Sequence, residues 1–331
     1  MALAACGGAG TAPAQPAPSS HTDIARLADG SYQFRVDGAP QALVGVGYNA
    51  LYDKLPRDQR ADNYRRDFAL MRDAGVNAIT GWDADKGYQQ DVFDEQTLKL
   101  ANEYGIGVIM PLNLPPSANY ADQSFVNGLL AQARGKIQRF KSYPALRMWG
   151  VGNEVFWGMP AAHDAAFEQA YLKIADLFHQ LDPNHPVIYR GAEDQWVPRI
   201  VDMLRGRDRR PWLIYGMNVF NKNLSPLLGR WPGYGLERPV VVSEYGAKGA
   251  TPADRARRTV DMWRQIRSFD RYVLGGFVYA WTTAGPEPTD TVWGLMDGQS
   301  KPVDDTWRSL ADEWRREAQN PGAKPSDEPL R

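Results

Sequence analysis

The sequence predicts one (β/α)₈ barrel, an α/β fold in which eight parallel strands are surrounded by helices. The chain has 331 residues, and 43% of them are hydrophobic, which suits a single large core. Short runs rich in Val, Ile and Tyr alternate with amphipathic helical segments, as in repeated βαβ units. Eight such runs occur, and the absence of a phosphate-binding glycine loop disfavours the alternative, a doubly wound open sheet.

The eight strands are expected at 42–49, 77–83, 107–114, 146–154, 186–191, 213–220, 239–246 and 275–283. Between them, apolar residues recur at helical spacing, in the sets Tyr64, Phe68, Met71; Phe167, Tyr171, Ile174; Val260, Trp263, Ile266; and Trp307, Leu310, Trp314. The stretch 221–239 fits a helix poorly and is expected to be a long functional loop. A further strand near 32–37 is expected to cap the bottom of the barrel.

The chain is expected to divide into three parts. Residues 1–22 are predicted to be a lipobox-like segment and flexible tether, residues 23–317 the barrel, and residues 318–331 a loose polar tail. The stretch "LAAC" at 3–6 resembles a bacterial lipoprotein cleavage box, with Cys6 as the lipidated residue, and an Ala/Pro/Ser-rich tether follows it. This predicts a lipoprotein of a bacterial cell envelope, facing the periplasm or the surface, or a secreted protein; an accidental match is the alternative.

Composition excludes several classes of function. The net charge is −1, so no overall field favours nucleic acid or an anionic membrane. Membrane attachment is therefore expected only through Cys6. One cysteine excludes an internal disulfide, and the four histidines lack metal-ligand spacing. We expect no metal and no organic cofactor, and the oligomeric state is left open.

Two carboxylates follow opposite strands of the predicted barrel. In this fold the functional residues lie at the carboxyl ends of the strands. Glu154 follows the fourth strand and Glu244 the seventh. Each alone is readily explained as an exposed strand-end charge, but together they face one cleft. Two opposed carboxylates are what the hydrolysis of a glycosidic bond requires.

Further strand-end side chains are candidates for binding a sugar. Asn153 is expected to bond a sugar hydroxyl, Tyr245 to donate to the Glu244 carboxylate, and Trp281 to stack on a pyranose ring. The predicted binding set is Tyr48, Asn49, Trp82, Asp83, Asn113, Asn153, Trp157, Arg190, Asn218, Tyr245 and Trp281. Tryptophans expected near the cleft, with core packing as the alternative for each, are Trp82, Trp157, Trp231, Trp281 and Trp293.

Several motifs resemble the retaining β-glycosidases of glycoside hydrolase clan A. "GVGNE" is similar to the acid/base motif of that clan, and "VVVSEYGAKG" to its nucleophile motif. The likeness is nearest to the family 2 catalytic barrel, with "SEYG" also resembling β-1,3-glucanosyltransferases. The resemblance implies that Glu154 is the general acid/base, that Glu244 is the nucleophile, and that no cofactor takes part.

Two positions depart from the clan pattern. Many members end the second strand with an arginine that supports the nucleophile, whereas this chain has "NAITGWD" with Thr80 there. Arg190, at the end of the fifth strand, is the candidate for a compensating positive charge. Phe220 stands where relatives often carry a tyrosine.

The resulting hypothesis is double displacement with retention on a β-linked oligo- or polysaccharide, namely a β-glucan or another polysaccharide of the envelope or the extracellular space. Its two carboxyl groups would then lie ~5–5.5 Å apart. A β-glucan transglycosylase using the same two glutamates is one alternative. A non-catalytic glycan-binding lipoprotein is the other, and the sequence leaves the sugar and its linkage open.

Overall fold

The protein folds as a closed barrel of eight parallel strands. The computed structural model describes residues 19–52, 55–82, 93–192, 194–204 and 210–319. The strands are hydrogen-bonded in the order β10-β11-β4-β5-β6-β7-β8-β9. Their bounds are β4 Leu43–Gly47, β5 Ala78–Thr80, β6 Gly107–Leu112, β7 Leu146–Asn153, β8 Val187–Gly191, β9 Leu213–Phe220, β10 Val240–Gly246 and β11 Val273–Tyr279. Each corresponds to a predicted strand, so the (β/α)₈ prediction is confirmed.

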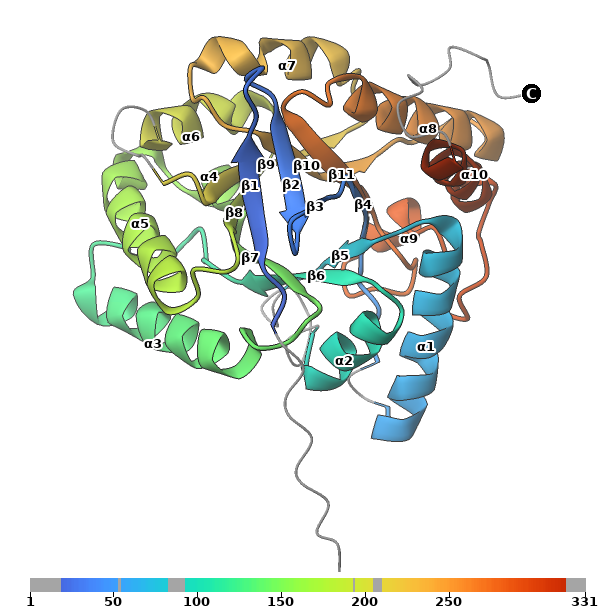
Figure 1. Cartoon of the computed structure of the whole chain (residues 1–331), viewed down its shortest axis with the longest axis horizontal. Helices are drawn as coiled ribbons and strands as arrows, with labels where there is room; N and C mark the ends of the chain where they lie inside the picture. Colours follow the sequence, from blue (N-terminus) through green and yellow to red (C-terminus); the bar gives the residue numbers. More distant parts are fainter. Residues whose placement is uncertain (1–18, 53–54, 83–92, 193, 205–209, 320–331) are drawn as a thin grey trace, which may run out of the picture.

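Helices surround the barrel (Figure 1). The longer ones are α1 Arg57–Ala74, α2 Glu95–Glu103, α3 Gln123–Phe140, α5 Asp164–Leu181, α6 Val197–Leu204, α8 Pro252–Ser268 and α10 Thr306–Gln319. Short pieces are α4 Val155–Gly158, η2 Ala161–His163, η3 Asp194–Trp196, α7 Ser225–Arg230, η4 Trp231–Tyr234 and α9 Asp290–Trp293. The apolar residues predicted at helical spacing are all buried. Among the described helices, none combines the length and apolar character needed to cross a membrane.

The stretch 221–239 is not the continuous loop that the sequence predicted. It contains α7 and η4, and each begins with a proline in its first turn, Pro226 and Pro232. Proline suits that position because the first backbone N–H groups of a helix have no intrahelical partner. Trp231 is 3% exposed and donates its indole N–H to the carbonyl of Arg238 at 2.7 Å, so it belongs to the core and not to the cleft.

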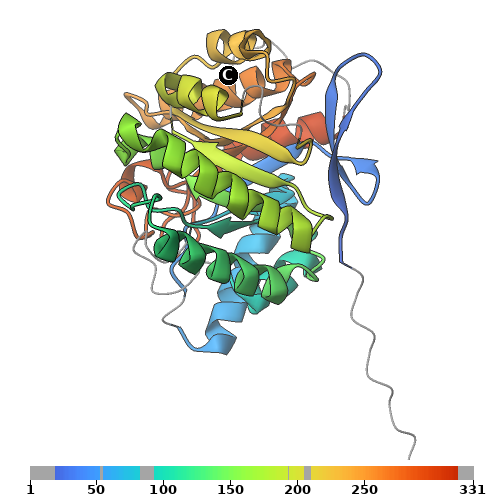
Figure 2. The same ribbon diagram turned by 90° about the vertical axis from the view of Figure 1, so that its left-hand side faces the viewer.

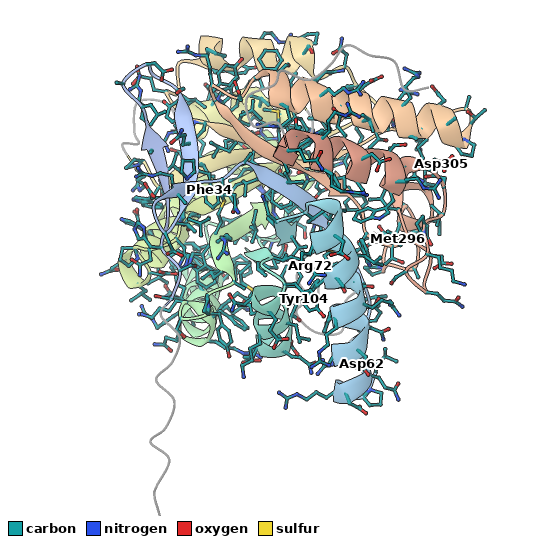
Figure 3. All side chains as sticks on the ribbon, turned by 45° about the vertical axis from the view of Figure 1, so that its right-hand side comes forward. Phe34, Asp62, Arg72, Tyr104, Met296 and Asp305 are labelled. Atoms are coloured by element: carbon teal, nitrogen blue, oxygen red, sulfur yellow. The ribbon has the colours of Figure 1, made fainter. Side chains whose placement is uncertain are left out.

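A small antiparallel sheet closes one end of the barrel (Figure 2). It consists of β1 Thr22–Arg26, β2 Tyr32–Val36 and β3 Ala39–Pro40. Phe34, labelled in Figure 3, is buried against a cluster of residues from the barrel strands, including Ile109 and Val241. The predicted cap near 32–37 is confirmed, whereas β1 was not predicted.

The ends of the described chain are attached to the barrel. Ser20 is buried and donates its hydroxyl to the carbonyl of Leu146 at 2.6 Å, just before β1. At the other end α10 runs to Gln319, two residues into the stretch predicted to be a tail. Residues 1–18, with Cys6, and residues 320–331 lie outside the described chain.

Two large side chains in the barrel interior, Phe277 and Arg190, lie beside glycines of the neighbouring strands. A Cβ on Gly45 would lie 2.1 Å from the ring of Phe277, so that ring occupies the space. A Cβ on Gly150 would lie 3.6 Å from Nε of Arg190. Phe277 and Arg190 are thus buried inside the barrel, and polar strand-end residues line a cavity at the carboxyl ends of the strands.

Candidate active site

Glu154 stands at a sharp turn where β7 passes into α4. Its backbone has φ +53° and ψ +25°, in the left-handed region that few residues other than glycine adopt. Its N–H donates to the carbonyl of Arg190 at 2.8 Å, which ties the turn to β8. Such a conformation persists only where its surroundings impose it, and it is enriched at functional sites. The turn explains why a buried strand ends on a carboxylate.

Asn218, on β9, fixes the orientation of the Glu154 carboxylate. Its side-chain N–H₂ donates to Oε1 of Glu154 at 2.9 Å and to Oδ1 of Asn153 at 3.2 Å. Its own Oδ1 accepts the hydroxyl of Ser243, on β10, at 2.7 Å. Because the hydroxyl occupies the oxygen side of the amide, the nitrogen side faces the carboxylate. Asn218 is fully buried, so this arrangement is protected from water.

Glu244, on β10, is held by a tryptophan from across the barrel. The indole N–H of Trp82, which follows β5, donates to Oε1 of Glu244 at 3.2 Å. Both side chains are nearly buried, with 6% of Trp82 and 5% of Glu244 exposed. Two residues before this donor, Thr80 stands where clan A relatives carry the supporting arginine. An indole donor thus reaches the Glu244 carboxylate from the same end of the same strand.

Arg190 lies beneath the cavity and supports the strand that carries Trp82. One terminal nitrogen of its guanidinium donates to Oγ1 of Thr80 at 3.0 Å and to the carbonyl of Gly81 at 2.8 Å. Arg190 is 2% exposed and does not line the cavity. Its prediction as a sugar-binding residue is therefore wrong, because its long side chain runs across the barrel interior to β5.

The two glutamates line the same cavity, whose volume is about 380 Å³. Trp82, Asn153 and Trp157 lie on its wall, as the sequence placed them. The complete described lining is Trp82, Asn153, Glu154, Trp157, Phe220, Asn221, Glu244, Tyr279, Glu287, Thr289 and Trp293. Trp157 is 58% exposed, so one face of its indole is open to solvent or ligand.

Comparison of the sequence with known protein families identifies the family of this barrel. The sequence model described as "Glycosyl hydrolases family 2, TIM barrel domain" matches residues 30–293. The chain belongs to glycosyl hydrolase family 2.

Curated relatives of this family 2 barrel are distant and longer. A β-galactosidase of Vibrio cholerae is 25% identical over 279 residues, which cover 78% of this chain and 24% of the relative. A β-glucuronidase of Chlorocebus aethiops is 28% identical over 230 residues, covering 65% of this chain and 32% of the relative. The chain thus spans about a quarter to a third of the length of these curated relatives.

Solved structures share the fold at lower identity. A family 2 β-galacturonidase of Eisenbergiella tayi superposes with a TM-score of 0.67 at 16% identity, covering 89% of this chain and 54% of that chain. A β-glucuronidase of Dictyoglomus thermophilum gives a TM-score of 0.66 at 18% identity, covering 89% and 54%. At these identities the likeness supports the barrel architecture alone.

Tyr245 and Trp281 do not serve this cavity, contrary to the sequence prediction. Tyr245 follows Glu244 directly, and successive side chains of a strand face opposite ways. It is fully buried against Trp263 of α8, with ring centroids 6.4 Å apart, and burial raises its pKa well above the ordinary value. Trp281 is also fully buried and packs edge-on against Trp307 of α10, at 5.3 Å.

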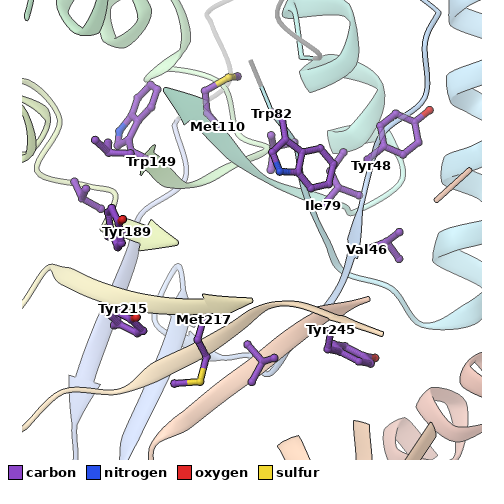
Figure 4. Close-up of a cluster of buried hydrophobic side chains, with 14 of the residues drawn as sticks. Val46, Tyr48, Ile79, Trp82, Met110, Trp149, Tyr189, Tyr215, Met217 and Tyr245 are labelled. Carbon is purple, nitrogen blue, oxygen red and sulfur yellow. The ribbon is translucent and has the colours of Figure 1, made fainter. Parts of the chain in front are cut away.

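Tyr48 and Asn49 are likewise structural. Figure 4 shows Tyr48 and Trp82 on opposite sides of β4. The Tyr48 hydroxyl donates to the buried Asp67 of α1 at 2.8 Å. The Asn49 amide exchanges two hydrogen bonds of 2.8 Å with the backbone of Thr282. Both residues are buried, and neither is on the described lining of the cavity.

Asn113 and Asp83 are the remaining residues of the predicted binding set. Asn113 is partly buried but is not on the described lining. Asp83 lies outside the described residues. The structure therefore gives neither a place in the site.

Three aromatic residues form a further part of the described cavity wall, and of these Phe220 and Trp293 were named from the sequence but Tyr279 was missed. Tyr279 ends β11 and packs edge-on against Trp82, at 5.3 Å, and against Phe220, at 5.8 Å. Phe220 also contacts Trp293, at 4.9 Å. Also missed were Asn221, Glu287 and Thr289. An earlier end for the last strand would have identified Tyr279, whereas Glu287 and Thr289 lie in a loop that no strand period predicts.

Proposed function

We propose that this family 2 barrel is a retaining β-glycosidase, with Glu244 as nucleophile and Glu154 as general acid/base. The observation that carries the proposal is the pairing of these carboxylates on one cavity wall, each with its own donor. Glu244 accepts from Trp82 at 3.2 Å, and Glu154 accepts from Asn218 at 2.9 Å. The two carboxylates thus have different hydrogen-bond donors from different strands, which suits different roles.

The reaction runs through two displacements. An oxygen of Glu244 attacks the anomeric carbon while the bond from that carbon to the leaving oxygen breaks, and Glu154 gives its proton to that oxygen. The ionised Glu154 then takes a proton from water, whose oxygen attacks the anomeric carbon and releases Glu244. The configuration at the anomeric carbon is inverted twice and therefore retained.

An extended β-linked glycan is the proposed substrate. Trp157 lies on α4, the helix that begins directly after Glu154. The acid/base acts on the leaving group, so an exposed indole beside it is placed to stack on the sugar that leaves. The same platform favours the second candidate, transfer to a sugar hydroxyl, because it would also hold an incoming acceptor.

We also propose that lipid on Cys6 holds the barrel in a bacterial envelope, on the support of the "LAAC" stretch and the tether-like sequence behind it. Metabolic labelling with a palmitate analogue tests this. Label that depends on the cysteine, and is lost in Cys6→Ser, is the expected result; an unlabelled wild-type protein contradicts it.

The activity is tested by chromatographic product profiles on β-glucan, mannan, xylan and galactan oligosaccharides. Wild type is compared with Glu154→Gln and Glu244→Gln, and with Glu103→Gln as a control on the exposed face of α2. We expect products that disappear in both site variants and persist in the control. Proton NMR should show that the first product has the β configuration.

The product lengths separate the candidates. Shorter products alone indicate hydrolysis, and products longer than the substrate indicate transfer. Binding of a glycan without turnover by wild type would favour the non-catalytic lipoprotein. Turnover that survives both site variants would exclude the assigned pair.

A further inference from the structure

A third carboxylate lies on the wall of the cavity. Glu287 belongs to the loop that leaves β11 and enters α9, and it lines the same cavity as Glu154 and Glu244. It is half-buried. Its carboxylate makes no hydrogen bond or ion pair with another residue of the described chain. The proposed double displacement uses two carboxylates, so Glu287 has no role in that chemistry.

The backbone that carries Glu287 is held in place. Asp290, which is fully buried, accepts the N–H of Glu287 at 3.0 Å and the hydroxyl of Tyr279 at 2.7 Å. The N–H of Asp290 in turn donates to the carbonyl of Glu287 at 2.9 Å. Pro286 and Pro288 flank the glutamate and restrict its neighbouring torsions. Glu287 is thus presented to the cavity from a preorganised turn, which limits the ordering cost of binding.

Glu287 belongs to the loop after β11, whereas Glu154, the proposed acid/base, follows β7. β11 and β7 lie four places apart in the ring of eight strands. Glu154 acts at the leaving group, so the β11 side of the cavity receives the sugar whose anomeric carbon is attacked, the glycone. Glu287 is therefore placed to contact glycone hydroxyl groups distant from the reacting carbon.

Every charged residue on the described wall of the cavity is a glutamate. Three glutamates line it, and its described residues include no Lys, Arg or His. Lys248 contacts the ring of Trp293, at 5.2 Å from its centroid, but is not on the lining. A sugar carboxylate bound here would lie beside like charges, whereas a pair of hydroxyl groups offers the donors that a carboxylate needs.

We propose that Glu287 selects an uncharged glycone by accepting hydrogen bonds from two neighbouring sugar hydroxyl groups and repelling uronic acids. The proposal rests on the proposed glycosidase function and defines its substrate class as glycans of neutral sugars. The proposal gives this chain a substrate class different from that in the names of the relatives called β-glucuronidase and β-galacturonidase. Unpaired polar groups are strongly penalised in such sites, so the selectivity should be large.

The test uses 4-nitrophenyl β-D-glucoside, β-D-galactoside and β-D-glucuronide with wild type, Glu287→Gln, Glu287→Ala and the Glu103→Gln control. For wild type we expect kcat/KM on the better neutral substrate to exceed that on the glucuronide by ~10²-fold or more. Glu287→Gln keeps an acceptor but loses the charge, so this ratio should fall ~10-fold or more. Glu287→Ala should lower kcat/KM on the neutral substrate ~10²-fold.

Two kinetic results overturn the proposal. One is a wild type that prefers the glucuronide. The other is a neutral-to-glucuronide ratio that stays the same in Glu287→Gln while thermal unfolding reports an intact fold. The control variant should match wild type throughout.

A binding measurement separates failure of this proposal from failure of the glycosidase function. If wild type turns over none of the three substrates, D-glucose, D-galactose and D-glucuronate are titrated against wild type and Glu287→Gln by tryptophan fluorescence. Weaker neutral-sugar binding and stronger glucuronate binding in the variant support the role of Glu287 without catalysis. Equal affinities in the two proteins, or no neutral-sugar binding by wild type, contradict it.

Discussion

Trp82 donates its indole N–H to Glu244 at 3.2 Å, while Arg190 donates to Thr80 at 3.0 Å beneath it. In many clan A relatives, an arginine at the end of the second strand supports the nucleophile. Here a hydrogen bond to Glu244, the proposed nucleophile, comes from a neutral indole, and the guanidinium of Arg190 is on the fifth strand. Thr80 is therefore compatible with a supported nucleophile.

Replacing Trp82 with Phe should reduce catalysis more than it reduces stability. The indole N–H is the group removed, and a hydrogen bond to a charged partner is worth about 1.5–3 kcal/mol. That corresponds to a loss in kcat/KM of about 10- to 150-fold. Steady-state kinetics and thermal unfolding on the same preparation measure both effects. A folded variant with wild-type kcat/KM would show that the bond has no catalytic role.

Asn218→Ala should impair the acid/base step selectively. Without the amide, the Glu154 carboxylate loses its donor at 2.9 Å and with it a fixed orientation for proton transfer. We expect kcat/KM on 4-nitrophenyl glycosides to fall ~10- to 100-fold. The loss should be much smaller with a 2,4-dinitrophenyl leaving group, which needs little protonation. Equal losses for both leaving groups would instead indicate a general structural defect.

The fold could be predicted because βαβ periodicity extends along most of the chain, but strand ends could not be placed accurately. β11 ends at Tyr279, and the predicted strand ran to 283, so Trp281 was taken for the cavity residue. β4 ends at Gly47, and the predicted strand ran to 49. The side chains of a strand alternate regularly only as far as the strand runs, so the alternation does not place Trp281 or Asn49, which follow the strand ends and are buried.

The glutamate pair was within reach of sequence reasoning, but their partners were not. Glu154 and Glu244 follow strongly apolar strands, which marks their positions directly. The donors come from other strands, 64 residues away for Asn218 and 162 residues away for Trp82. Only the closure of the barrel brings such residues together. Glu287 is carried by a loop whose course depends on the buried Asp290.

Trp281→Ala should lower the stability of the fold, whereas Trp157→Ala should weaken oligosaccharide binding. Trp281 is fully buried between Tyr48 and Trp307, so its loss should cost about 3–5 kcal/mol of unfolding free energy. Trp157 is 58% exposed on the cavity wall, so its loss should weaken oligosaccharide binding and leave stability almost unchanged. Denaturant unfolding and oligosaccharide titration measure the two quantities. The opposite assignment would restore Trp281 as a sugar platform.

The ion pair between Glu95 and Arg139 should make a small, pH-dependent contribution to stability. The hydrogen bond from Arg139 lowers the pKa of Glu95 from 4.5 to about 2. The two side chains are 36% and 49% exposed, so screening by water limits the pair to less than about 1 kcal/mol. Because the folded pKa is the lower one, this stability is present above pH 4.5 and is lost as pH falls toward 2.

Glu95→Gln should therefore unfold more easily than wild type at pH 7, and the difference should shrink below pH 4.5 as the wild-type carboxylate becomes protonated. Urea unfolding at a series of pH values measures it. Arg139→Gln should show the same pH dependence, and adding Glu95→Gln to it should cause little further change, since the two side chains share one interaction. A difference between Glu95→Gln and wild type that persists unchanged at pH 3 would assign the effect to packing of α2 instead of to the charge.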